Sequence, residues 1–135
     1  MKGQNQTDTT PNNGDALRAC VASIFEEEND SLPNFIADPR GYLPALQEWL
    51  QPNYAFLKVR LLDGRLEFPF QAPDNFSCYC VLAGPSPRGA HKHCVVGKVV
   101  DSEFEVAHDP YPSGGNLAGS PEWAGFFLSL HPAKP

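Results

Sequence analysis

Residues 14–25, with the sequence GDALRACVASIF, form the stretch that decides the fold. Apolar side chains recur in it three and four positions apart, which predicts a helix over residues 15–28 with one buried face. Gly14 and Asp15 supply a turn and then a candidate N-cap. The acidic side chains at 26–28 and 30 oppose the helix dipole at the far end, which is typical of a solvated helix end. The apolar positions of the predicted helix are Leu17, Cys20, Val21, Ile24 and Phe25.

Beyond this helix the hydrophobic period changes from that of helices to that of strands. Residues 31–38 predict a short turn or half-helix, and 43–51 predict a second helix with Leu43, Leu46, Trp49 and Leu50 on one side. Residues 111–121 form a loop rich in Gly, Pro and Ser. Alternation and turn residues predict strands at 54–62, 65–70, 78–83, 93–100, 103–108 and 125–130.

Helices followed by antiparallel strands are typical of the α+β class. No repeat or linker divides the chain, so we expect a single domain over residues 1–135, with 1–13 as a polar N-terminal arm. The predicted fold is therefore a long first helix packed on a small antiparallel sheet.

The composition argues against several classes of protein. The chain has 135 residues, a formal net charge of −6 and four cysteines. No apolar run approaches the ~20 residues of a membrane helix, and the polar start, MKGQNQTDTTPNNGD, is unlike a signal peptide. We therefore expect a cytoplasmic protein with reduced thiols and no membrane partner. The acidic balance also argues against nucleic acid as a partner.

Three clusters contain residues capable of chemistry. The first is the turn into the first helix, at 12–20; the second is HKHCVVG at 91–97; the third is His108-Asp109-Pro110. A thiol at a helix N-terminus is activated by the dipole and by a nearby histidine. Such a histidine needs a third group to fix its tautomer. Along the chain, the three clusters supply these parts in the order helix start, histidine and carboxylate.

Together the segments GDALRACVASIF, HKHCVVG and VAHDPYPSGG resemble the papain-like cysteine peptidases of the bacteriocin-processing type. The similarity is greater to small standalone relatives from bacteria and phages, and it spans about residues 6–127. It implies a papain-like fold in which the N-terminus of the first helix faces a histidine across a cleft. It implies no cofactor and no metal.

The resemblance also assigns roles to individual residues. The general base falls on His93 and its orienting carboxylate on Asp109. The oxyanion-stabilising residue falls on Gln6, with Asn13 as the fallback. The nucleophile falls on position 16, where this chain has Ala16 instead of cysteine. Loops beside these groups are the natural place for substrate contacts, which makes Ser86, Arg88 and Trp123 the candidate substrate-binding residues.

Two interpretations of Ala16 remain open. It is either an engineered Cys→Ala substitution or a natural loss that leaves a binding-only pseudoenzyme. The presence of His93, Asp109 and Gln6 favours the first, because a drifting pseudoenzyme has no catalytic reason to keep them. In both cases the chain as given is expected to be inactive.

The implied activity of a cysteine-containing parent is thiol chemistry on a peptide, isopeptide or other amide bond. Such a thiol protease or amide hydrolase would act on a peptide or protein substrate. Acyl transfer to an amine by the same triad is an alternative, and peptide or protein binding without turnover is another.

Two further hypotheses concern the remaining thiols and histidines. Cys20 lies one helical turn beyond Ala16, where a buried core cysteine is the simpler interpretation. A zinc site is the competing chemistry, since Cys78 and Cys80 share one face of a predicted strand. Its other possible ligands are His91, His93, Cys94 and His108.

The pairing of His93 with Asp109 makes a geometric demand on the hairpin between them. A regular two-residue turn at 101–102 would place the two residues on opposite faces. We therefore predict an odd-length loop or a β-bulge in this hairpin. His108, which alternates with Asp109, should then point to the other face and have a structural role.

Overall fold

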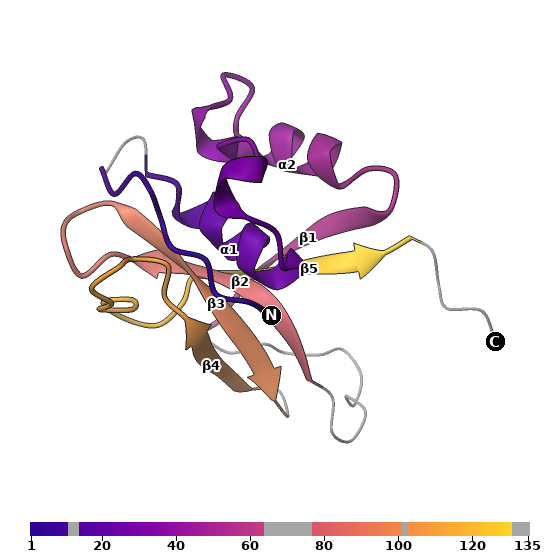
Figure 1. Cartoon of the computed structure of the whole chain (residues 1–135). Coiled ribbons are helices and arrows are strands. Elements are labelled where there is room, and N and C mark those ends of the chain that lie inside the picture. The colour runs from indigo at the N-terminus through magenta and orange to yellow at the C-terminus, as the bar shows by residue number, and fades with distance from the viewer. Residues whose placement is uncertain (11–13, 64–76, 101–102, 131–135) are drawn as a thin grey trace.

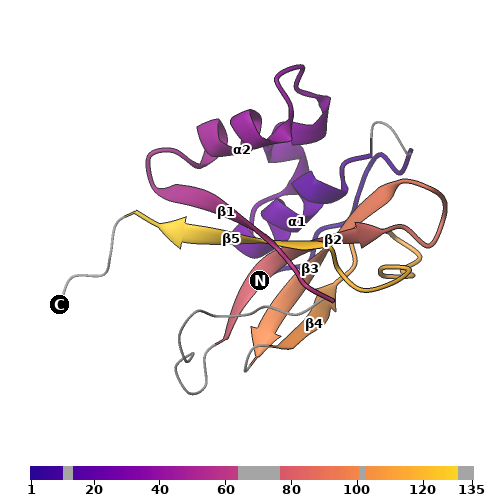
Figure 2. The same cartoon turned by 180° about the vertical axis from the view of Figure 1, so that it is seen from behind.

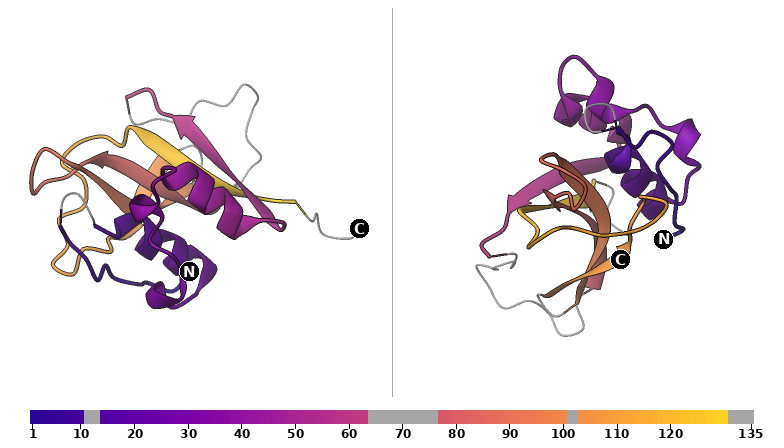
Figure 3. Two further views of the ribbon diagram at one scale, coloured as in Figure 1. Left: turned by 90° about the horizontal axis from the view of Figure 1, so that it is seen from above. Right: turned by 90° about the vertical axis from the view of Figure 1, so that its left-hand side faces the viewer.

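The computed structural model describes residues 1–10, 14–63, 77–100 and 103–130. Within these residues, two α-helices and two short 3-10 helices precede five β-strands, and every strand pairing is antiparallel. The predicted α+β class is confirmed. Both α-helices cover one face of a curved sheet, and the N-terminal arm runs beside α1 (Figures 1 and 3).

The helices are shorter than or shifted from their predicted limits. Helix α1 spans Ala16–Phe25 rather than 15–28, because Glu26 adopts a left-handed conformation and the Glu27 N–H bonds back to the carbonyl of Ala22. Helix α2 spans Tyr42–Leu50, and Leu43 is exposed rather than on the buried side. The stretch predicted as a half-helix contains the 3-10 helix η2, Phe35–Ala37, and η1 precedes it at Asn29–Ser31.

The strands occur close to the predicted positions. They are β1 Tyr54–Arg60, β2 Ser77–Pro85, β3 Lys92–Val100, β4 Glu103–His108 and β5 Trp123–Ser129. The strand predicted at 65–70 and the turn at 101–102 lie outside the described residues.

The sheet has the order β1-β5-β2-β3-β4, so the last strand lies in its interior (Figure 2). Strand β5 pairs with β1 along its whole length and with β2 through Trp123–Gly125. This insertion joins the β2-β3-β4 meander to β1 and carries Trp123 next to β2. Sequence order alone would have placed β5 at an edge.

The predicted irregularity in the β3–β4 hairpin is present as a bulge. Val100 lies opposite Glu103, but the register shifts between Gly97, which faces Val106, and Val96, which faces His108. The extra residue in β4 changes which side chains follow it at the strand end.

Hydrophobic side chains cover both faces of the sheet. On the helix-covered face, Phe35 and Leu46 meet sheet residues that include Phe56 and Val81. The other face carries a smaller cluster of Leu61, Cys80, Leu82, Val95, Val99 and Ala124. None of the described helices is long and apolar enough to cross a membrane.

Gly125 is the position in the sheet least tolerant of a side chain. A Cβ atom there would overlap the ring of Phe56, which belongs to the helix-side core. Because protein cores are closely packed, a shift of the ring would disturb its neighbours in that core.

We expect Gly125→Ala to lower the free energy of unfolding by about 2 kcal/mol, the usual effect of overpacking. Urea denaturation would measure the change. Gly119→Ala is the matched control, since a Cβ at Gly119 meets nothing within 4 Å. Equal stability of the two variants would contradict the close approach of Phe56.

Candidate active site

The helix N-terminus and the β3–β4 hairpin meet at one cleft of about 250 Å³. Ala16, His93 and Gln6 all line it, and so do Arg88 and Trp123. Three separate stretches of sequence thus contribute to one site. A larger, more open hollow of about 670 Å³ lies on the far side of Trp123 and contains none of the predicted catalytic residues.

His93 and Asp109 form the best-defined polar contact of the site. The imidazole Nε2 lies 2.7 Å from Oδ1 of Asp109, and both side chains are almost completely buried. An ionised carboxylate only accepts hydrogen bonds, so Nε2 must carry the hydrogen. In the neutral ring Nδ1 then has the lone pair, and His93 is equipped to accept a proton there.

Backbone N–H groups also hold the Asp109 carboxylate. Tyr111 donates to Oδ1 at 3.0 Å and Asn116 donates to Oδ2 at 2.7 Å. Burial works against ionisation of Asp109, but the bonds from His93 and from these amides outweigh it and lower the pKa below the ordinary value. The 109–116 loop therefore holds an ionised carboxylate against His93.

His93 itself has a lowered pKa. Burial is the main cause, and the positive charges of Arg88 and His91 add to it, while Asp109 acts in the opposite direction. The imidazole is consequently neutral at neutral pH, which is the state required of a general base.

Helix α1 begins at Ala16 without a side-chain cap. Asp15 occupies the N-cap position but makes no capping hydrogen bond, so its predicted capping role is wrong. Among the described residues, no side chain caps the backbone N–H groups of the first helical turn. Uncapped groups of this kind stabilise a thiolate or an oxyanion placed before them.

The Asp15 carboxylate turns back toward the N-terminal arm instead. It accepts hydrogen bonds from the backbone N–H groups of Thr7 and Asp8 at 3.0 Å, and from Asn29 Nδ2 at 3.0 Å. Arg18 forms an ion pair with it at 2.7 Å. Burial opposes its ionisation, but these bonds prevail and hold its pKa well below the ordinary range.

This network positions Gln6 in the cleft. The Gln6 backbone N–H donates to the carbonyl of Pro110 at 2.8 Å, which ties the arm to the loop after Asp109. Its Nε2 donates to the carbonyl of Asp8, and Oε1 is buried without a hydrogen-bond partner. An amide nitrogen carries two hydrogens, so one remains for a bound group. Position 14 requires glycine, because a Cβ atom there would lie 2.7 Å from the carbonyl oxygen of Thr10 in the N-terminal arm.

The other predicted residues are distributed as follows. His91 lines the cleft, whereas Ser86 is buried in the turn before β3 and accepts a hydrogen bond from the Arg88 N–H. His108 Nε2 contacts the carbonyl of Gln4, so it anchors the arm. Asn13 lies outside the described residues.

All four cysteines are free. Burial raises the pKa of the Cys20 thiol, and it raises the pKa of Cys80 and of Cys94 to about 12. Cys78 is shifted in the same direction for the same reason. No native thiol is therefore an activated nucleophile. Within the described residues, no group of three His, Cys, Asp or Glu side chains is arranged to hold a metal ion.

Sequence reasoning did not identify Lys58 or Tyr42, which also line the cleft. Lys58 lies on β1 and Tyr42 on α2, and neither belongs to a motif.

Comparisons of the chain with family models, curated proteins and solved structures found no match.

We expect Asp15→Asn to lower the free energy of unfolding by roughly 3 kcal/mol, because it leaves Arg18 without its buried counter-charge. Urea denaturation at neutral pH would measure this. The difference in unfolding free energy should begin to shrink below about pH 4, where the Asp15 carboxyl of the unfolded chain takes up a proton, and it should continue to shrink as the pH falls toward the lowered pKa of the folded state. Asp38→Asn, which affects an exposed ion pair with Arg40, is the control and should change stability little. Equal effects of the two variants would contradict the role of Asp15.

His93 should titrate below the ordinary histidine pKa when followed by imidazole NMR. Arg88→Gln removes a positive charge and should raise the midpoint, while Asp109→Asn removes a negative charge and should lower it. Arg60→Gln, outside the cleft, should leave it unchanged. If Arg88→Gln and Asp109→Asn shifted the His93 pKa in the same direction, the pairing of His93 with an ionised Asp109 would be contradicted.

Proposed function

We propose that the chain has the scaffold of a papain-like cysteine hydrolase, with Ala16 in place of the nucleophilic cysteine. The observation that carries the proposal is that one cleft is lined by Ala16 at a helix N-terminus and by His93, whose far nitrogen bonds Asp109. Nucleophile position, base and orienting carboxylate are arranged in the order that thiol catalysis needs. As given, the chain lacks the nucleophile.

With cysteine at position 16, the reaction would proceed in two steps. Nδ1 of His93 takes the thiol proton, and the thiolate attacks the carbonyl carbon of an amide. First-turn N–H groups of α1 and the Gln6 amide donate to the resulting oxyanion. His93 returns the proton to the departing amine, and water activated by His93 then hydrolyses the thioester. An amine in place of water would give acyl transfer.

Restoring the thiol tests this proposal. In Ala16→Cys, iodoacetamide should alkylate the introduced thiol at pH 6 at least about tenfold faster than an ordinary surface thiol, because a paired thiolate is ionised there. Mass spectrometry of the labelled peptide would measure the rate. His93→Ala in the same background should reduce the alkylation rate to that of an ordinary surface thiol.

Ala37→Cys supplies the matched surface thiol, since Ala37 is exposed in η2. If the thiol introduced at position 16 reacts no faster than this control, or reacts independently of His93, the hydrolase proposal fails. The second candidate function, peptide binding without turnover, is favoured by Ala16 itself. An unreactive thiol in a folded Ala16→Cys variant would support it.

A further inference from the structure

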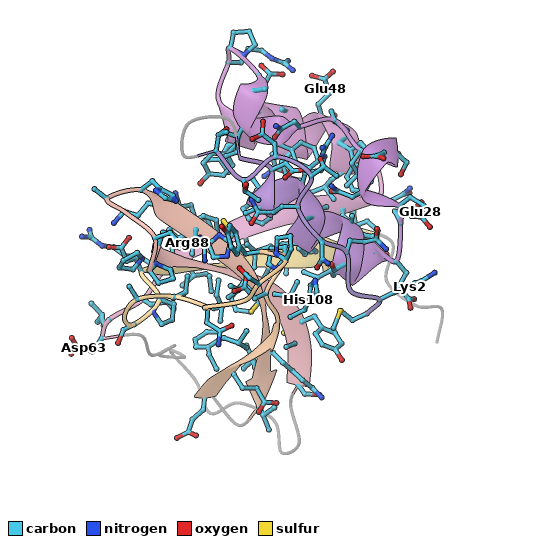
Figure 4. The ribbon with its side chains drawn as sticks, turned by 60° about the vertical axis from the view of Figure 1, so that its left-hand side comes forward. Lys2, Glu28, Glu48, Asp63, Arg88 and His108 are labelled. Atoms are coloured by element: carbon cyan, nitrogen blue, oxygen red, sulfur yellow. The ribbon has the colours of Figure 1, made fainter. Side chains whose placement is uncertain are left out.

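No Asp or Glu side chain is among the described residues that line the cleft at Ala16, although the whole chain has a formal net charge of −6. The charged side chains of the cleft are those of Lys58, Arg88 and Lys92. In Figure 4, Glu28, Glu48 and Asp63 project at the margins of the molecule, while Arg88 lies over the strands near its middle. The local charge of the cleft is thus opposite in sign to that of the protein, an arrangement that attracts anions.

Two of these cations have no carboxylate partner within the described part of the chain. The third, Lys92, pairs with Glu122 at 2.8 Å. Arg88 instead lies 3.4 Å from the ring centroid of Tyr111 and donates to a backbone carbonyl. Lys58 forms no ion pair there, so its charge is available to a ligand.

Lys58 is held in place by two aromatic rings. Its Nζ lies 2.7 Å from the Tyr42 hydroxyl and 4.7 Å from the ring centroid of Trp123. The two rings are stacked, with an interplanar angle of 8°. We call Tyr42, Lys58 and Trp123 the Lys58 cluster. An ammonium group has three donors, and with one directed at Tyr42 two remain for a bound anion.

The Lys58 cluster lies at the edge of the cleft, where a bound chain would extend beyond the reacting bond. Lys58 and Trp123 line both the Ala16 cleft and the larger hollow beyond it. That hollow also contains the acidic residues Asp63 and Glu122. Arg60 lines the hollow as well, so its acidic and basic side chains balance, whereas the described lining of the Ala16 cleft has basic side chains and no acidic ones. Attraction of an anion is therefore stronger on the side of the cluster that faces Ala16.

We propose that the cleft selects an amide substrate with a carboxylate near the bond at Ala16, seated on the Lys58 cluster. Lys58 would bind the carboxylate, and the rings of Trp123 and Tyr42 would contact the hydrocarbon portion that carries it. The inference deepens the proposed function, because it takes the Ala16 cleft as the substrate site. The carboxylate belongs to an acidic side chain or to a free C-terminus.

The chain with Ala16 tests the proposal directly, because it contains no nucleophile that would turn a substrate over. Immobilised protein is equilibrated at low salt with three pools of random hexapeptides, and mass spectrometry measures retention. One pool is amidated with a fixed Asp, one is amidated with a fixed Asn, and one has the fixed Asn with a free C-terminus. Asp and Glu are excluded from the random positions.

We expect at least one carboxylate-bearing pool to be retained about fivefold more than the amidated Asn pool, with the preference falling as salt rises. Which of the two is retained identifies the source of the carboxylate. Lys58→Met should remove the preference. Lys98→Met is the matched control, since Lys98 also lies over an aromatic ring, Tyr79, and does not line the cleft. Circular dichroism verifies that both variants fold.

Equal retention of all three pools would overturn the proposal, and so would equal loss of preference in both lysine variants, which would indicate only bulk charge. Neither result depends on thiol chemistry. Conversely, an unreactive thiol in Ala16→Cys together with a Lys58-dependent preference would refute the hydrolase and leave the carboxylate site standing.

Discussion

The buried Asp15 carboxylate is the point on which the arrangement of the site depends. It joins the arm through Thr7 and Asp8, the start of α1 through Arg18, and the η1 turn through Asn29. Because a buried carboxylate requires several donors, these segments must come together for the chain to fold. Their assembly places Gln6 and Ala16 in one cleft and leaves the first helical turn uncapped.

The second half of the site depends on a bulge rather than on a charge. The register shift in β3–β4 directs the chain after His108 so that Asp109 reaches His93, while His108 contacts the arm. The arm is then linked to both halves of the site, through Asp15 and through the Pro110 carbonyl. Backbone bonds and side-chain bonds thus fix the cleft from two sides.

Periodicity and turn residues predicted the α+β class, both α-helices and the described strands to within a few residues, because each of these elements except β4 contains buried apolar residues. The bulge was predictable because a histidine and a carboxylate had to meet across a hairpin.

Other features depend on tertiary contacts that no local pattern encodes. Asp15 has the sequence position of an N-cap, but its partners include Asp8 and Asn29, which are seven and fourteen residues away. No sequence motif includes Lys58 or Tyr42. Their contact with Trp123 arises only because β5 pairs with β1.

The four native thiols have a practical consequence for work on this molecule. Each has a pKa raised by burial, so each is largely unionised at neutral pH. Cys20 and Cys80 are in addition completely buried, so a fluorophore, spin label or cross-linker directed at thiols would react with an introduced surface cysteine in preference to them. Cys78 and Cys94 are only partly buried, so these are the two cysteines to replace before labelling.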